Sequence, residues 1–454
     1  MRRNLLLASC SALLLWGCST HLPSSRSQKH QALTAQAKEG VRSYLMAQMD
    51  KETPEMLQKR QRNLLSSLPL RVGHLEEARE ELWQLWREAN EKRMQDNQFT
   101  SLCQAPQEVI WDLPEGERMK IALFCKGNKP SRGYALYINL HGGGKDPSAS
   151  SPWGAAFNDR EWAAARSLGQ AYKDTGSLYY VPRMADDRKG RWYLAPQRVA
   201  FRRAWQLAVL SGEVDPDRIY LMGISEGGYG SHRLALYMPD YFAGIGPMAA
   251  AEPLKAAENL RNVAFRLSVG EHDRGFGRNK LAQAWKEELA RLAEQNPGDF
   301  VHEVHIQPAM GHGINYYPTA PWLEHHSRRN YPKRVSYKYH NMTHDYAAAS
   351  YSAGVYYLDF RQIRRASDAS SISLDVHRSG NTLSVTTHEG NGVSGKLRLY
   401  LDEIDYKQPI VVQLNGVEVV RKRIEPSWDA LVESLMLWGD PRRLYGSYVE
   451  ITLP

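Results

Sequence analysis

Hydrophobic and polar positions divide the chain into three stretches with different periods. Between residues 33 and 103 apolar side chains recur every three or four positions, as on one face of a helix. The clearest set is Leu75, Ala78, Leu82, Leu85, Trp86 and Ala89. Between 104 and 332 short apolar runs alternate with helical stretches, and from 333 to 454 apolar and polar residues alternate singly. We therefore expect N-terminal helices, a central unit of strands and helices, and a C-terminal β unit.

The central stretch predicts a mostly parallel sheet with helices on both faces, that is, an α/β fold. Its buried-strand candidates are the apolar runs 134–140, 177–182, 218–224, 242–250, 263–270 and 301–308. Helical patterns separate these runs. Alternating strands and helices are typical of a parallel sheet that is covered on both sides.

The C-terminal stretch predicts a separate small β-sandwich joined by tight hairpins. Asn415-Gly416 lies between two alternating runs, which is a strong signal for a type I′ turn. Ser379-Gly380-Asn381 is a second turn of this kind. We expect no helix in this part of the chain.

Composition then restricts the class of protein. The chain has 454 residues, of which 42% are hydrophobic, 24% charged and 10% aromatic. This composition supplies a sizeable core and excludes a collagen, a disulfide-dense miniprotein and a wholly disordered chain. No run of about 18 apolar residues occurs, which excludes a polytopic membrane protein. The net charge of +8 is modest and its basic residues are dispersed, which argues against a nucleic-acid partner.

The first residues, MRRNLLLASCSALLLWGCST, have the order of an export signal. Two arginines precede the apolar stretch 5–16, which ends at Gly17-Cys18. The letters LWGC at 15–18 resemble the lipobox of bacterial lipoproteins. This resemblance implies a signal peptide over 1–17 and a lipid on Cys18.

A membrane anchor and a tether follow from that interpretation. The segment 18–32 is polar and Ser-rich, as expected of a flexible connection. Ser19 resembles the default for the outer membrane, so the expected location is exported and lipid-anchored there, on its periplasmic or surface face. The alternative is a plain signal peptide without lipid.

Two cysteines remain for the folded body once Cys10 leaves with the signal and Cys18 takes a lipid. Cys103 and Cys125 flank two short strand patterns separated by Pro114-Glu115-Gly116. In an oxidising compartment a disulfide tying this hairpin would stabilise the fold by about 3 kcal/mol. Two buried thiols are the alternative.

The segment RIYLMGISEGGYGSHRLALYM carries the main chemical signal. A strand ends in Gly223-Ile224-Ser225-Glu226-Gly227 and continues directly into a helical pattern. Glycines flank the serine because the turn from strand to helix is sharp, and the turn lifts the hydroxyl clear of the sheet. Ser225 is therefore the candidate nucleophile; an ordinary turn serine is the alternative.

A second glycine motif follows the strand 134–140. His141-Gly142-Gly143-Gly144 can turn backbone N–H groups toward a developing oxyanion. We expect Gly143 or Gly144 to donate, together with the N–H of Glu226. A flexible loop without this role is the alternative.

Two later residues complete a candidate triad. Asp273 follows the strand 263–270, where a carboxylate can orient a histidine, and Glu271 is its competitor. His312 lies in a glycine-flanked loop after the last strand candidate. Ser225, Asp273 and His312 then stand in the chain order of nucleophile, acid and base.

Together these motifs resemble the α/β-hydrolase superfamily, within it the secreted esterases called poly(3-hydroxybutyrate)-depolymerase-like or prolyl-oligopeptidase-like. Short motifs at 158–162 (NDREW), 181–183 (VPR) and 260–262 (LRN) stand where that group has similar ones. The segment ending LNGVEVV resembles the β module of those proteins. The resemblance covers residues 104–454.

Ester hydrolysis through an acyl-enzyme is the function that this resemblance implies, with acyl groups on carbohydrate among the substrates. Trp192 and Tyr316 are candidate substrate contacts, although loop packing is the favoured explanation for such aromatic residues. No cofactor motif or metal-ligand spacing occurs in the sequence, so no cofactor or metal is expected. A serine peptidase and a non-catalytic binding lipoprotein are the alternatives.

Overall fold

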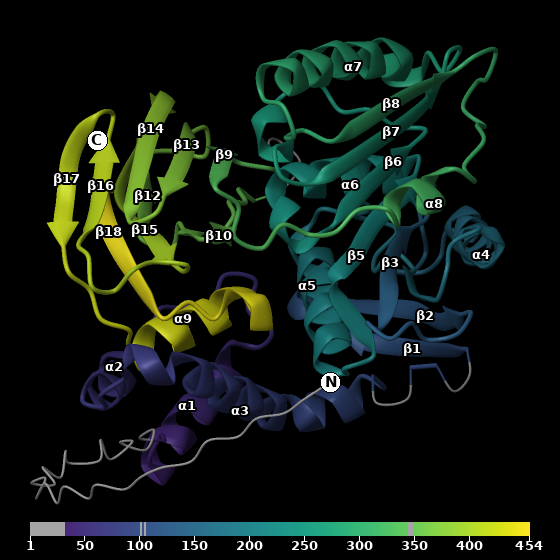
Figure 1. Cartoon of the computed structure of the whole chain (residues 1–454). Coiled ribbons are helices and arrows are strands. Elements are labelled where there is room, and N and C mark those ends of the chain that lie inside the picture. Colours follow the sequence, from purple (N-terminus) through teal and green to yellow (C-terminus); the bar gives the residue numbers. More distant parts are fainter. Residues whose placement is uncertain (1–31, 100–101, 104–105, 344–347) are drawn as a thin grey trace, which may run out of the picture.

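A computed structural model describes residues 32–99, 102–103, 106–343 and 348–454. Helices come first, a large sheet covered by helices follows, and a β-rich part ends the chain (Figure 1). The expected signal segment 1–17, the expected lipid attachment at Cys18 and the tether up to residue 31 lie outside the described residues. Within the described ranges no helix is both long and apolar enough to cross a bilayer.

In the described part of the chain, eight strands form one sheet in the order β1-β2-β4-β3-β5-β6-β7-β8. They are β1 (Gln107–Asp112), β2 (Arg118–Lys126), β3 (Tyr134–Leu140), β4 (Ser177–Pro182), β5 (Val214–Ile224), β6 (Gly244–Met248), β7 (Ala264–Gly270) and β8 (His302–Gln307). Neighbours from β4 to β8 run parallel, whereas β1 and β2 are antiparallel additions at one edge. The predicted fold class is confirmed, and the carboxyl ends of the parallel strands meet at one edge of the sheet.

Alternate side chains of the strands enter two cores, one on each face of the sheet. In β3, Leu136 and Ile138 belong to one core and Tyr137 to the other. The first face is covered by α5 (Ala195–Leu210), α6 (Glu226–Tyr237) and α7 (Arg278–Gln295), and the second by α4 (Ala156–Ala171) and α8 (Thr319–Leu323). Burial on both sides explains why these strands are uninterrupted apolar runs in the sequence.

The hairpin expected between the two cysteines is formed by β1 and β2. Its strands pair antiparallel around the turn Pro114–Gly116. Cys103 and Cys125 are joined in a disulfide, with their Cα atoms 5.2 Å apart. The bond ties the segment after α3 (Leu75–Asp96) to the edge of the sheet.

Two five-stranded sheets make up the C-terminal part over residues 334–343 and 348–454. One has the order β17-β16-β14-β13-β9, and the other comprises β10-β11-β15-β12 with β18 paired to β15. Their strands are β9 (Arg334–Tyr339), β10 (Gly354–Val355), β11 (Leu358–Asp359), β12 (Ile363–Arg365), β13 (Ser371–Ser379), β14 (Thr382–Asn391), β15 (Val393–Leu401), β16 (Ile410–Leu414), β17 (Val417–Lys422) and β18 (Ser447–Leu453). Asn415 and Gly416 both have positive φ between β16 and β17, as a type I′ turn requires.

The helix α9 (Trp428–Trp438) corrects the expectation that no helix follows residue 333. Within it only Asp429 lies outside the buried set. A helix that is buried on nearly all sides has no exposed polar face, so the pattern that reveals an amphipathic helix is missing. Ser427 accepts a hydrogen bond from the Ala430 N–H at its start, and Gly439 ends it with a φ of 66°.

The N-terminal helices contact both of the larger parts of the molecule. These are α1 (Ala35–Gln48), α2 (Lys59–Ser66) and α3, and all three contact α9 (Figure 1). Arg79 of α3 donates to Asp402 and to the Leu444 carbonyl, both in the C-terminal part. Arg93 of the same helix reaches Gln206 of α5. The apolar face predicted for α3 is buried.

A buried ion network also joins the C-terminal part to the sheet domain. Asp440 accepts from Arg328 at 2.6 Å and from Arg443 at 2.7 Å, and Arg443 also pairs with Asp240. All four side chains are almost fully buried. Burial raises the pKa of Asp440, but the two guanidinium groups outweigh that effect and hold it well below its usual range.

Replacing Asp440 by asparagine should lower the free energy of unfolding by about 3–5 kcal/mol, because two guanidinium groups lose a buried partner. Urea unfolding at pH 7 measures this, with the exposed Asp368→Asn as control. Because the folded-state pKa of Asp440 is depressed, its contribution is complete above the unfolded value of about 3.9 and fades as the pH falls toward the folded value. An unchanged midpoint for Asp440→Asn would show that this network does not hold the two parts together.

Candidate active site

Ser225 occupies a strained turn between β5 and α6. Its φ of 54° and ψ of −113° lie outside the regions that residues with a side chain normally adopt. A Cβ atom on Gly223 would overlap the Gly227 carbonyl, and one on Gly227 would overlap the Leu140 carbonyl. The flanking glycines are therefore required by close backbone packing. The Ser225 N–H donates to Met248 at 2.9 Å, which fixes the turn against β6.

The structure brings the three candidate triad residues into hydrogen-bonding contact. His312 Nε2 lies 3.0 Å from Ser225 Oγ, and His312 Nδ1 lies 2.8 Å from Asp273 Oδ2. Since a carboxylate can only accept, Nδ1 carries the proton and Nε2 accepts from the serine. Gln307, at the end of β8, bonds both the N–H and the carbonyl of Asn315 and so closes the loop that carries His312.

Asp273 is held by a second partner that sequence reasoning missed. The guanidinium of Arg278 donates to both of its carboxylate oxygens at 2.8 Å. Burial raises the pKa of Asp273, but the bonds from Arg278 and His312 outweigh it and lower that pKa. Its competitor Glu271 is exposed and accepts from the Ala309 N–H instead. No sequence motif marks Arg278, which begins α7. Only the fold reveals that its guanidinium lies next to Asp273.

The glycine loop after β3 supports part of the predicted oxyanion site. The Gly144 N–H donates to Asn158 Oδ1 at 2.9 Å, so of the two glycines expected as alternative oxyanion donors, Gly144 is already engaged in this conformation. The N–H groups of Gly143 and Glu226 have no partner among the described residues. Gly143 has a φ of 85°, and a Cβ there would overlap Asn158. Gly143 and Glu226 remain the candidate donors.

Asn158 braces this loop from α4. Its amide also donates to the Gly144 carbonyl at 2.9 Å and to Asp187 at 2.7 Å. Asp187 is in turn paired with Arg183, with both side chains fully buried. Asn158 and Arg183 belong to the short motifs noted in the sequence, whose function there was unassigned.

Trp192 does not contact the site, which corrects its assignment to substrate binding. Its side chain is fully buried, and its Nε1–H donates to the His141 carbonyl at 3.1 Å. His141 is buried too, and burial together with nearby Arg183 lowers its pKa to about 3. Tyr316, by contrast, is half-buried, and its hydroxyl lies 3.5 Å from the His312 carbonyl. Tyr316 therefore remains a candidate substrate contact.

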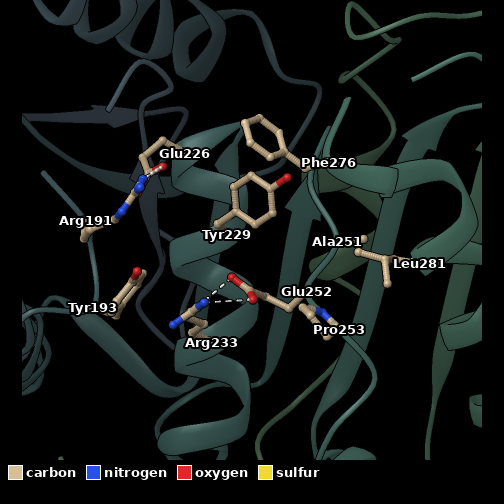
Figure 2. Close-up of a pocket in the computed structure, with 10 residues that line it drawn as sticks. All are labelled: Arg191, Tyr193, Glu226, Tyr229, Arg233, Ala251, Glu252, Pro253, Phe276 and Leu281. Atoms are coloured by element: carbon tan, nitrogen blue, oxygen red, sulfur yellow. Dashed lines mark hydrogen bonds and ion pairs between the residues drawn. The ribbon is translucent and has the colours of Figure 1, made fainter. Parts of the chain in front are cut away.

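The turn between β5 and α6 that carries Ser225 is called the elbow. A pocket of about 270 Å³ lies beside it (Figure 2). Its lining residues are Arg191, Tyr193, Glu226, Tyr229, Arg233, Ala251, Glu252, Pro253, Phe276 and Leu281. Two ion pairs stand in its wall: Arg191 with Glu226 at 2.6 Å, and Arg233 with both oxygens of Glu252 at 2.6 and 3.0 Å. Tyr229 links it to the triad, because its hydroxyl accepts from Arg278 at 3.3 Å.

Glu226 combines a backbone N–H near the nucleophile with a carboxyl in the pocket wall. Burial raises the pKa of its carboxyl to about 7, against the lowering effect of Arg191. Its Oε1 has no hydrogen-bond partner among the described residues, in keeping with that burial.

Within the described ranges, no three His, Cys, Asp or Glu side chains gather in a way that would hold a metal ion. The arrangement at Ser225 is suited to nucleophilic catalysis. His312 can remove the serine proton while Asp273 keeps the imidazole in the required tautomer. The N–H groups of Gly143 and Glu226, unpartnered among the described residues, remain the candidate donors to a negative oxygen.

No protein-family model matches the chain. A curated protein of Nocardia uniformis subsp. tsuyamanensis, described as "Putative esterase NocK", is 46% identical over 48 residues, which is 11% of this chain and 14% of that protein. The match therefore spans only a small part of the curated relative.

Similar solved structures cover about half of the chain. They include a thermostable esterase (19% identity, TM-score 0.37, 49% of this chain and 63% of that chain) and a ferulic acid esterase (13%, 0.33, 49% and 97%). Another is a Bacteroides ovatus protein titled a "putative dipeptidyl aminopeptidase IV" (14%, 0.34, 49% and 34%). The fold assignment rests on the strand order and the elbow rather than on these similarities.

Replacing Asp273 by asparagine should slow covalent labelling of Ser225 by a fluorophosphonate about 10⁴-fold, since the amide no longer fixes the imidazole tautomer. Intact-mass spectrometry over time measures the rate. Glu271→Gln is the matched control and should label like the wild type. Slow labelling of Glu271→Gln with normal labelling of Asp273→Asn would transfer the role of the acid to Glu271.

Proposed function

We propose that the protein is a serine hydrolase that cleaves carboxylic esters. The observation that carries this proposal is the connected set Ser225–His312–Asp273, with contacts of 3.0 and 2.8 Å, at a glycine-flanked elbow. Such a set matches the order and the mutual geometry that ester hydrolysis through an acyl-enzyme requires.

In the first half of the reaction Ser225 Oγ attacks the ester carbonyl carbon while His312 Nε2 takes its proton. The carbonyl oxygen becomes negative and is stabilised by the N–H groups of Gly143 and Glu226. The tetrahedral intermediate then collapses, and His312 returns the proton to the departing alcohol. Asp273 stabilises the imidazolium throughout, without itself taking a proton.

In the second half water replaces the alcohol. His312 removes a proton from the water, whose oxygen attacks the acyl carbon bound to Ser225. Collapse of the second intermediate releases the acid, and His312 returns the proton to Ser225 Oγ. No step requires a group from outside the chain other than water.

Esters are favoured over peptides as substrates by the charges in the neighbouring pocket. A peptidase that trims chain ends must bind a substrate ammonium group, but Glu226 and Glu252 are each already paired with an arginine. A non-catalytic binding protein has no use for the aligned triad.

The proposed location is outside the cytoplasm, at the outer membrane, through a lipid on Cys18. The disulfide between Cys103 and Cys125 supports export, because such bonds persist in oxidising compartments. Fractionation of cells expressing Cys18→Ala beside the wild type tests the anchor: the variant should leave the membrane fraction, and its retention there would reject it.

The ester activity is tested with soluble protein beginning at Ser19. Wild type should hydrolyse p-nitrophenyl acetate and butyrate, and Ser225→Ala should lower kcat by about 10⁴–10⁶-fold because the nucleophile is lost. Ser66→Ala, on α2, is the control and should retain full activity. Cleavage of an aminoacyl-p-nitroanilide in preference to the esters would indicate a peptidase, and equal inactivity of all three proteins would reject the hydrolase.

A further inference from the structure

The carboxylate of Asp273 is shared between His312 and an arginine that lies outside the candidate triad. Asp273 and Arg278 are both buried. Arg278 Nε donates to Asp273 Oδ2 and Arg278 Nη2 donates to Oδ1, each at 2.8 Å. His312 Nδ1 bonds the same Oδ2, also at 2.8 Å. Because the guanidinium and the imidazole meet at one oxygen atom, a charge on either group acts strongly on the other.

The surroundings of Arg278 hold its guanidinium in this orientation. Its Nη1 donates to the hydroxyl of Tyr229, and the ring centre of Phe276 lies 5.4 Å from the guanidinium carbon. Both aromatic side chains lie at the pocket beside the elbow (Figure 2). A Cβ atom on Gly275 would come within 2.7 Å of Arg278 Nη2, so the glycine leaves the space that the guanidinium occupies.

The helix that begins with Arg278 does not benefit from a cation at this position. Arg278 is the first residue of α7, and the first turn of this helix contains no acidic side chain. A positive group there opposes the positive end of the helix dipole. The favourable partner of the guanidinium is therefore Asp273, which indicates a role in the site rather than in the helix.

Other titratable groups lie around the triad, but they act on it less directly. In the described part of the chain, only Arg278 and His312 bond the carboxylate of Asp273. The remaining groups are Glu226 and Tyr229 on α6, Glu252 after β6, Tyr316 in the loop of His312, Glu161 on α4, and the exposed Glu271, His272 and Arg274.

We propose that Arg278 is a positioning residue of the hydrolase and extends its activity to lower pH. Its two bonds to Asp273 fix the carboxylate so that Oδ2 faces His312. Its charge opposes protonation of the imidazole, which would bring a second cation to the same oxygen. His312 can act as a base only while its Nε2 is unprotonated. This inference rests on the proposed ester hydrolysis, in which His312 takes the proton of the serine.

The pH profile of kcat/KM for p-nitrophenyl butyrate separates the charge of Arg278 from its hydrogen bonds. Rates are followed at the isosbestic wavelength of p-nitrophenol, at constant ionic strength. Arg278→Gln should move the midpoint of the acid limb up by about one pH unit, because the opposing charge is lost. It should also lower the plateau about tenfold, because the carboxylate is less well fixed. Arg278→Lys should keep the wild-type midpoint and lower only the plateau, about three- to tenfold, because it retains the charge but not the paired bonds.

Two further variants control this measurement. Arg291→Gln removes the same charge from an exposed position of α7, where Arg291 pairs with Glu288, and should leave the midpoint and the plateau unchanged. Gly275→Ala leaves Arg278 itself intact, but its methyl group displaces the guanidinium. Its midpoint should therefore move up, by less than in Arg278→Gln. This variant decides the question if Arg278→Gln does not fold.

Two results would overturn the role of Arg278: an acid limb that stays in place in both Arg278→Gln and Gly275→Ala, or an equal shift in Arg278→Gln and Arg278→Lys. The rate at which a fluorophosphonate labels Ser225, measured over the same pH range, gives a profile that does not need turnover. Ester hydrolysis with unshifted profiles would reject only the role of Arg278. A protein that hydrolyses no ester, but whose labelling profile shifts in Arg278→Gln, would retain that role and reject the proposed function.

Discussion

The crowded turn between β5 and α6 is the constraint on which the site depends. Gly223 and Gly227 leave no room for a Cβ atom, and between them Ser225 is held at a positive φ. The turn is fixed at the carboxyl edge of the sheet because β5 pairs in parallel with β3 on one side and β6 on the other. The loops after β7 and β8 emerge at this same edge and bring Asp273 and His312 to the serine.

Buried polar contacts then fix the groups around the serine. Arg278 donates to both carboxylate oxygens of Asp273. Asn158 forms hydrogen bonds with both the N–H and the carbonyl of Gly144. Such contacts are costly to bury unless every partner is in place, and here they act on the two loops whose geometry matters for chemistry. A consequence is that one glycine N–H is used for support and is lost as an oxyanion donor. Asp273, the candidate acid, likewise pairs with Arg278 as well as with His312.

The sequence predicts those features that local patterns determine. Apolar runs with intervening helical stretches indicate the parallel sheet. Asn415-Gly416 indicates the hairpin between β16 and β17 in the C-terminal part. The chain order of Ser225, Asp273 and His312 follows from motifs at strand ends. Features that depend on distant neighbours escape prediction. The helix α9 has no polar face, Trp192 packs beneath His141, and the position of Phe276 beside the elbow follows only from how α7 begins.

The central claim is that Ser225 carries the acyl group during turnover. Wild-type protein mixed with p-nitrophenyl acetate and quenched in acid within the first turnover, then digested and analysed by mass spectrometry, tests it directly. The account predicts one acetyl group on the peptide that contains Ser225, formed together with a burst of p-nitrophenol. Acetyl found on another residue at full stoichiometry, or ester hydrolysis by the protein with no acetylated serine, would contradict it.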